Sequence, residues 1–117
     1  MRAWVAVLVD VVCVLVFVGI GRATHDEALS LGGYLGTAWP FLVALGVGWA
    51  VTQAWKRAER IWPTGVVVWV VTVALGMVLR AVSGQGTDPA FVVVATLFLG
   101  AVLLGWRGLF VGLRQRR

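Results

Sequence analysis

An acidic residue interrupts the first apolar stretch of the sequence. Asp10 stands between Val-Leu-Val and Val-Val-Cys. A carboxylate in the middle of a membrane-spanning helix costs about 2.5–3.5 kcal/mol on insertion scales, so such a residue should face other helices and have a partner. Two interpretations remain open. Asp10 is either a proton or cation site, or a structural acid held by Arg107, Gln53 or Thr52.

A second set of residues that could take part in binding or catalysis follows the first and third apolar stretches. Its members are Arg22, His25, Asp26, Glu27, Arg80 and Asp88. An arginine at a membrane edge commonly extends its charge toward the head groups, and Arg22 has this simple interpretation. Alternatively, the acids neutralise Arg22 and Arg80 in a structural ion-pair cap, or the two arginines form a pocket for an anionic ligand. All three interpretations remain open.

Metal and enzyme chemistry have little support in the sequence. His25 is the single histidine and Cys13 the single cysteine, whereas a zinc site needs three or four ligands. Cys13 lies in an apolar stretch, where a free thiol behaves as a small hydrophobic side chain. The sequence contains no Ser-His-Asp arrangement, nucleotide motif or phosphate-binding glycine loop. We therefore expect no catalytic residue, no metal and no cofactor, and we predict that the protein is not an enzyme.

The composition places these residues in a membrane protein. Of the 117 residues, 61% are hydrophobic and 13% are charged, whereas soluble domains are about half apolar and a quarter charged. The net charge of +5 could indicate nucleic-acid binding, but the basic residues occur in short clusters between apolar stretches. That arrangement is typical of membrane proteins. We expect the lipid bilayer as a partner, and no nucleic acid.

Four stretches are long enough to cross a bilayer as helices, which takes about 20 mostly apolar residues. They cover residues 3–21, 38–55, 64–82 and 89–106, and the last could continue toward Leu113. The first stretch lacks the alternation of polar and apolar residues that a membrane β-barrel requires. Pro40, Pro63 and Pro89 fall near the predicted helix starts, where proline is tolerated. The predicted fold is all-α, a single domain over residues 1–117 with four transmembrane helices and a short basic tail from 107 to 117.

The basic residues predict the orientation of the chain. Eight of the ten lysines and arginines lie before the first stretch, between the second and third, or after the fourth, and only Arg22 and Arg80 lie on the other side. Because cytoplasmic flanks collect Lys and Arg, we predict a multi-pass protein of the cell membrane with both termini in the cytoplasm. An inner aromatic belt is expected from Trp4, Trp55, Trp62 and Trp106, and an outer one from Tyr34 and Trp39.

One face of the third stretch is predicted to pack against another helix. Gly65, Trp69, Thr72, Gly76 and Arg80 recur every three or four residues, so they share one side of a helix. Small residues on a membrane helix let a second helix approach closely. The Thr72 hydroxyl could form a hydrogen bond across this contact.

Several short motifs occur in combination. They are Asp10 in the first stretch, "GRATH" at 21–25, "TAWPF" at 37–41, "GW" at 48–49, the glycine, tryptophan, threonine and arginine series from 65 to 80, and "GWR" at 105–107. Together they resemble a family of small four-span membrane proteins of bacteria and archaea, known as domain of unknown function 3054. The resemblance covers nearly the whole chain. It implies an integral membrane protein with four helices and no assigned activity, and it supplies no catalytic residues.

Three functions remain open. The first is a non-enzymatic helix bundle that assembles as a homo-oligomer or with a larger membrane complex, which the abundant glycines and short loops favour. The second is a small transporter or channel that uses Asp10. The chain is similar to small multidrug exporters in size only, and its charge bias favours a single orientation. The third is a membrane enzyme that uses His25 and the arginines on a lipid-linked phosphate, for which no motif is present. We predict the first.

Overall fold

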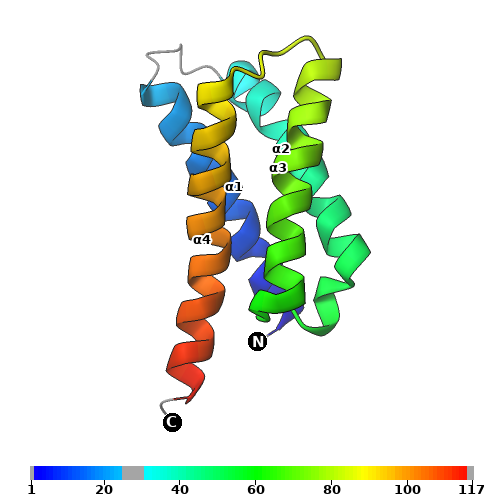
Figure 1. Ribbon diagram of the computed structural model, residues 1–117, viewed down its shortest axis with the longest axis vertical. Helices are drawn as coiled ribbons and strands as arrows, with labels where there is room; N and C mark the ends of the chain where they lie inside the picture. The colour runs from blue at the N-terminus through cyan, green and yellow to red at the C-terminus, as the bar shows by residue number, and fades with distance from the viewer. Residues whose placement is uncertain (1, 25–30, 116–117) are drawn as a thin grey trace.

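The computed structural model describes residues 2–24 and 31–115, which form four long helices and no strand (Figure 1). The helices are α1 (Ala3–Thr24), α2 (Leu31–Thr52), α3 (Val66–Val82) and α4 (Pro89–Gln115). A short 3-10 turn, Ala54–Lys56, and a wider helical turn, Ile61–Gly65, lie between α2 and α3. The predicted all-α fold is confirmed, and four apolar helices in the described residues are long enough to cross a membrane.

The helices form an elongated bundle with extents of 45 × 25 × 24 Å. The start of α1, the end of α4 and the connection between α2 and α3 lie at one end (Figure 1). We call it the basic end, because Lys56, Arg57, Arg60 and Arg114 lie there. The other end, where residues 83–88 join α3 to α4, is called the opposite end. The cytoplasmic location of the basic end stays a prediction from its charge.

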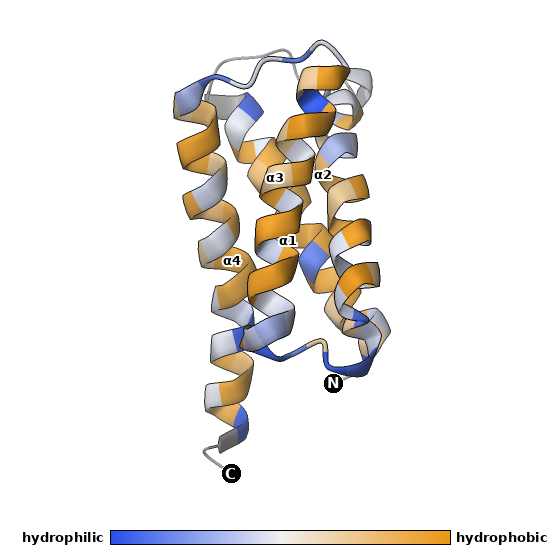
Figure 2. Cartoon of the chain, turned by 45° about the vertical axis from the view of Figure 1, so that its right-hand side comes forward, coloured by the Kyte–Doolittle hydropathy of each residue, from blue (hydrophilic) through white to orange (hydrophobic). Residues whose placement is uncertain are grey.

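Hydrophobic residues run along the length of the helices, and most hydrophilic residues gather at the two ends (Figure 2). Outward side chains such as Leu8, Val78 and Leu97 are 51%, 55% and 68% exposed. Soluble monomers rarely expose contiguous apolar surfaces of this extent, whereas lipid tails would cover them and helices satisfy their own backbone in lipid. The arrangement is that of a multi-pass membrane protein.

Aromatic rings from three helices form the centre of the core. Phe17 of α1, Phe41 of α2 and Phe91 of α4 have ring centroids 5.6–6.1 Å apart, and Phe98 packs against Phe17. Such edge-on and tilted contacts suit the charge distribution of the rings. The most extensive helix contact is between α2 and α3. Gly48 permits it, because a Cβ atom at this position would lie 3.2 Å from the α3 backbone.

The second helix begins earlier than the sequence predicted, at Leu31 instead of residue 38. The prediction was wrong because the glycines between residues 31 and 37 are poor helix formers, whereas tertiary contacts hold this segment in a helix. Tyr34 packs against Gly19 of α1 and donates a hydrogen bond to the Leu15 carbonyl. The polar end of this tyrosine therefore ties the first turn of α2 to α1.

The earlier start places Pro40 inside α2, not in its first turn. Proline has no N–H, so it cannot bond the carbonyl of Gly36 one turn before it. The side-chain amide of Gln85, from the connection between α3 and α4, donates to that carbonyl at 2.9 Å. A loop residue thus supplies the hydrogen bond that the helix lacks.

The remaining helix boundaries differ less from the prediction. α2 ends at Thr52, since Gln53 has a positive φ of 51°, so Trp55 lies in the turn and not in the helix. α3 begins at Val66, after the turn that contains Pro63. α4 continues past residue 106 to Gln115, as the apolar residues near its end indicated. The predicted basic tail is therefore helical as far as residue 115.

Candidate functional site

Asp10 is completely buried and forms an ion pair with Arg107. Arg107 Nη1 donates to Asp10 Oδ1 at 2.9 Å, and Nη2 donates to Oδ2 at 2.6 Å. Trp49 Nε1 donates to Oδ2 and Trp106 Nε1 donates to Oδ1, each at 2.8 Å. Each carboxylate oxygen therefore accepts two hydrogen bonds. We call these four residues the Asp10 cluster; its two-pronged pairing requires the planar fork of arginine.

The rest of the Arg107 side chain is also held in place. Nε donates to the Ala58 carbonyl at 2.8 Å, and Nη1 donates to the Leu103 carbonyl at 2.9 Å. The guanidinium carbon lies 4.5 Å from the ring centroid of Trp106. An unpaired buried charge would cost several kcal/mol, and the pairing with Asp10 offsets part of that cost. The cluster thereby joins α1, α2 and α4 to the connection between α2 and α3.

Of the three partners named for Asp10 from the sequence, the structure selects Arg107. Gln53 is exposed at the end of α2, and the Thr52 hydroxyl donates to the Gly48 carbonyl at 2.8 Å. The expectation that Arg107 belongs to a basic flank outside the last span is wrong, because α4 continues for two further turns and the arginine turns inward.

Sequence reasoning missed both tryptophans of the cluster as partners of Asp10. Trp106 was expected in an aromatic belt at the membrane edge, which stays a prediction; the bond from its indole N–H to the carboxylate was not expected. Trp4, Trp55 and Trp62 are well exposed near the basic end, as an aromatic belt requires. The sequence did contain one signal for the cluster, a Gly-Trp pair at 48–49 and again at 105–106. A buried indole N–H needs a hydrogen-bond acceptor, and Asp10 could provide one for each tryptophan.

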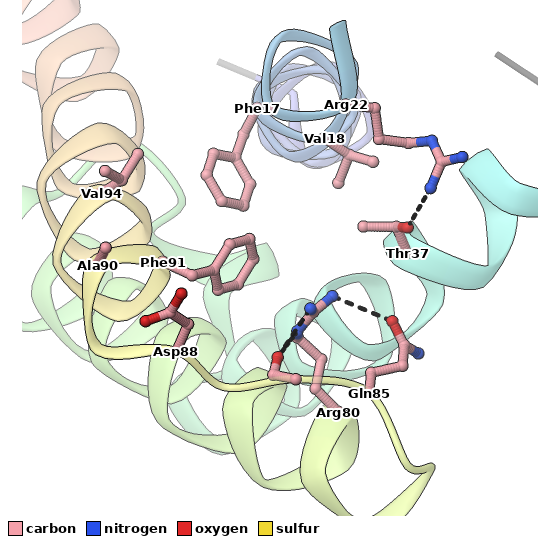
Figure 3. Close-up of a pocket in the computed structure, with 12 residues that line it drawn as sticks. Phe17, Val18, Arg22, Thr37, Arg80, Gln85, Asp88, Ala90, Phe91 and Val94 are labelled. Atoms are coloured by element: carbon pink, nitrogen blue, oxygen red, sulfur yellow. Dashed lines mark hydrogen bonds between the residues drawn. The ribbon is translucent and has the colours of Figure 1, made fainter. Parts of the chain in front are cut away.

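A cavity of about 540 Å³ opens at the opposite end of the bundle. We call it the arginine pocket, and its lining residues are Phe17, Val18, Gly21, Arg22, Thr37, Arg80, Gln85, Gly86, Asp88, Ala90, Phe91 and Val94. Figure 3 shows the side chain of Arg22 reaching from α1 toward Thr37, and that of Arg80 rising from α3 beside Gln85. The rings of Phe17 and Phe91 lie on the side of α1 and α4. Two cations thus share one hollow with an apolar wall.

Arg80 fastens the connection between α3 and α4 over this pocket. Its Nε and Nη2 donate to the Gly86 carbonyl at 3.0 and 2.8 Å, and Nη1 donates to Gln85 Oε1 at 3.0 Å. The guanidinium carbon lies 4.3 Å from the ring centroid of Phe91. Because Gln85 also bonds Gly36, one chain of contacts runs from α3 through the connection to α2.

The structure brings some of the predicted outer residues together. Arg22 Nη1 donates to Thr37 Oγ1 at 2.9 Å, and Arg22, Arg80 and Asp88 all line the arginine pocket. His25, Asp26 and Glu27 lie outside the described residues, so an ion-pair cap that uses those acids stays a prediction.

The predicted face of α3 points into the bundle. A Cβ atom on Gly65 would lie 2.8 Å from Cδ of Arg107, and one on Gly76 would lie 2.6 Å from Cδ1 of Phe41. Both glycines are therefore required for close approach. The first borders the Asp10 cluster and the second borders the aromatic core.

The two polar residues on this face differ. Trp69 Nε1 donates to the Thr96 carbonyl of α4 at 2.9 Å. Thr72 is completely buried, and its hydroxyl has no hydrogen-bond partner among the described residues. The hydrogen bond expected across the helix contact is therefore made by Trp69 and not by Thr72.

The described residues offer no cluster for a metal ion. Within residues 2–24 and 31–115, no group of three or more His, Cys, Asp or Glu side chains is close enough to hold one. Cys13 is a half-buried free thiol in α1.

Comparison with known proteins identifies a family and no closer relative. The family described as protein of unknown function (DUF3054) matches residues 7–110, a range that includes Asp10, Arg22, Arg80 and Arg107. No curated protein and no solved structure is significantly similar to the chain. The matched range contains both the Asp10 cluster and the arginine pocket, and the chain belongs to the DUF3054 family.

Proposed function

We propose that the protein is a non-enzymatic component of the cell membrane, a rigid bundle that assembles with copies of itself or with a larger membrane complex. The observation that carries this proposal is the Asp10 cluster. Asp10 and Arg107 neutralise each other inside the bundle. The cluster therefore holds the helices together and is poorly suited to carrying ions.

The geometry of the cluster argues against proton transport through Asp10. Both carboxylate oxygens accept hydrogen bonds from Arg107 and from an indole. Four donors fixed by the bundle thus occupy the carboxylate, and both members of the pair are completely buried. A transport site must exchange its ligand with each cycle, whereas this carboxylate has no such access.

The surface at the basic end supports the assembly part of the proposal. The last turns of α4 extend beyond the other helices (Figure 1), and Leu109 and Leu113 on this extension are 65% and 55% exposed. Trp62 in the neighbouring connection is 71% exposed. Large apolar side chains beyond the bundle offer a surface that a second protein could cover.

The alternative is a small transporter that uses Asp10, and the depth of this acid in α1 is the observation that favours it. A flux assay in proteoliposomes separates the two functions. We expect no flux of protons, cations or amphipathic cations in the wild type, and no change in Asp10→Asn. A pH-driven flux that disappears in Asp10→Asn, while the variant stays folded, would establish the transporter.

Assembly is tested by crosslinking in native membranes, followed by mass measurement of the captured species. We expect a homo-oligomer or a complex with a defined membrane protein. Leu109→Ser with Leu113→Ser should weaken it, whereas Leu97→Ser with Val93→Ser, on the lipid-facing part of α4, serves as the matched control. Recovery of the monomer alone would contradict the proposal.

A further inference from the structure

A second cavity lies at the basic end, between the connection of α2 to α3 and the last turns of α4. Its volume is about 390 Å³, and ligand sites begin at about 300 Å³. We call it the basic groove, and its lining residues are Lys56, Arg57, Glu59, Arg60, Val111 and Arg114. A charge bias that only orients the chain in the membrane would not require cations from two distant segments to converge on one hollow.

The basic groove carries an excess of positive charge. Its described lining contains four cations and one carboxylate, which leaves a net charge of +3. The carboxylate of Glu59 lies 3.4 Å from Arg114. Within residues 2–24 and 31–115, no acid forms an ion pair with Lys56, Arg57 or Arg60, and these three side chains are exposed. Because opposite charges attract, the groove suits an anion with more than one negative charge.

The backbone fixes the positions of these cations before any ligand binds. The N–H groups of Lys56, Arg57 and Arg60 each donate to the carbonyl three residues earlier, at 3.0–3.3 Å. Arg107 Nε donates to the Ala58 carbonyl at 2.8 Å, which fastens the connection to α4 from inside the bundle. A site that is already ordered loses less conformational freedom when it binds.

The groove lies at the boundary between apolar and polar parts of the chain. One candidate membrane span begins at Ile61, directly after Arg60, and the last one ends at Arg114. Trp55 and Ile61 are 52% and 40% exposed. Ile61 lies against α4, since a Cβ atom on Gly108 would be 3.8 Å from its Cδ1. Tryptophan and basic residues at the end of a span are typical of the level of the lipid head groups.

We propose that the basic groove binds the head group of an anionic lipid that carries two phosphates, with the phosphates beside Lys56, Arg57 and Arg60 and an acyl chain along Ile61. Basic pockets beside membrane helices suit such head groups. The apolar neighbour at the end of a span favours a lipid over a soluble anion of the same charge.

This site is separate from the surface proposed for assembly. Arg107, Val111 and Arg114 are three or four residues apart, so they share one face of α4. Leu109 and Leu113 lie on the other side of the same helix. A lipid in the groove would leave these leucines open to a second protein. The lipid proposal therefore goes beyond the assembly function and does not depend on it.

The test is native mass spectrometry of the full chain in detergent, titrated with cardiolipin, phosphatidylglycerol or phosphatidylcholine, whose head groups carry a double, a single and no net negative charge. We expect one cardiolipin molecule to bind at least about fivefold more tightly than phosphatidylglycerol, the effect of one further basic residue on an anionic lipid. Equal affinities for these two lipids would overturn the assignment of a doubly charged head group. Inorganic pyrophosphate provides the soluble probe, and binding as tight as that of cardiolipin would overturn the lipid assignment.

Charge variants separate the head group from the acyl chains, which are the same in every cardiolipin titration. Lys56→Gln, Arg57→Gln and Arg60→Gln should each weaken cardiolipin binding about fivefold. Their unfolding midpoints should stay unchanged, because the three side chains are exposed. Arg2→Gln is the matched control, an equal charge change at the basic end on an exposed residue that does not line the groove. Equal losses in Arg2→Gln and in the groove variants would refute the site.

The acid in the groove gives a variant of opposite sign. Glu59→Gln removes the negative charge that opposes the ligand and releases Arg114 from its ion pair. It should therefore increase the affinity for cardiolipin, by about fivefold if one cation is gained. An unchanged or lower affinity in Glu59→Gln would contradict the proposed arrangement of charges.

Discussion

The two ends of the bundle use arginine in different ways. Arg107, near the basic end, and Arg80, at the opposite end, both lie against an aromatic ring at 4.5 and 4.3 Å. Arg107 is completely buried and pairs with a carboxylate, whereas Arg80 is half-buried and bonds neutral oxygen atoms beside a cavity. An arginine whose charge is neutralised within the fold, such as Arg107, thus serves to hold helices together. At the opposite end the same side chain lines a cavity and holds the connection between α3 and α4 in place.

The largest expected effect concerns which end faces the cytoplasm. In a Cys13→Ala background, a cysteine at Gln115 should be protected from an impermeant thiol reagent in intact cells, and one at Thr87 should be labelled. The reason is the concentration of Lys and Arg at the basic end. Thr87 is preferred to Gln85 as the labelling position, because the side chain of Gln85 donates a hydrogen bond to the Gly36 carbonyl. The reverse labelling pattern would place the arginine pocket in the cytoplasmic leaflet.

The next effect concerns the buried ion pair. Asp10→Leu leaves Arg107 buried without a counter-ion, so it should lower the free energy of unfolding by about 3–5 kcal/mol, while the double variant with Arg107→Leu should recover much of that loss. Unfolding midpoints in detergent for both single variants and the double variant give the coupling energy. Strictly additive losses would show that the pair does not act as a unit.

A second ion pair provides the control for this cycle. Arg114 and Glu59 lie 3.4 Å apart at the basic end, with side-chain exposures of 61% and 22%. An exposed pair of this kind contributes about 0–1 kcal/mol. The cycle of Glu59→Leu and Arg114→Leu should therefore show weak coupling, and a coupling as strong as that of Asp10 and Arg107 would remove the contrast between buried and exposed pairs.

A smaller effect is expected from Gly65, the glycine that borders the Asp10 cluster. A methyl group at Gly65 would lie 2.8 Å from Cδ of Arg107 and 3.0 Å from Cδ2 of Leu104, so Gly65→Ala should cost about 1–3 kcal/mol by overpacking. Gly105→Ala, where nothing lies within 4 Å, is the control. The cost at residue 65 should fall once Arg107 is replaced by leucine in the Asp10→Leu background. A cost that persists there would place the strain elsewhere.

The smallest effect is expected at the opposite end. Gln85→Ala removes the donor to the Gly36 carbonyl and should lower stability by about 1 kcal/mol. Pro40→Ala restores the helical N–H that can bond this carbonyl. In that background the cost of Gln85→Ala should shrink, as measured by unfolding midpoints of the two singles and the double. Equal costs in both backgrounds would show that Gln85 does not substitute for the missing N–H.

The number of helices and the apolar surface could be predicted because both depend on local properties of the sequence. Spans of about 20 apolar residues and clustered basic residues are visible without any tertiary contact. The start of α2 could not be predicted in this way. Its first turns contain several glycines and are held by Tyr34 and by a hydrogen bond from Gln85, and both interactions join segments distant in sequence.

The candidate sites show the same limit. Asp10 could be predicted to need a partner, but the sequence left Arg107, Gln53 and Thr52 open as candidates, because only packing sets the rotation of each helix about its axis. The bond from Trp106 was missed for a related reason, because which side of α4 faces Asp10 depends on how the helices pack. A pocket beside Arg22 and Arg80 was one of three alternatives from the sequence, and its apolar wall could not be predicted, since a cavity depends on how four helices converge.

The pairing of Asp10 with Arg107 also has a consequence for biogenesis. The two residues are 97 positions apart, and a chain is synthesised from its N-terminus, so α1 with its acid is made well before α4. Trp49 is the first member of the cluster to follow Asp10, and Arg107 is the last. A chain that stops before α4 keeps an intramembrane carboxylate without its counter-ion. The last helix to be synthesised therefore supplies the counter-ion for the first.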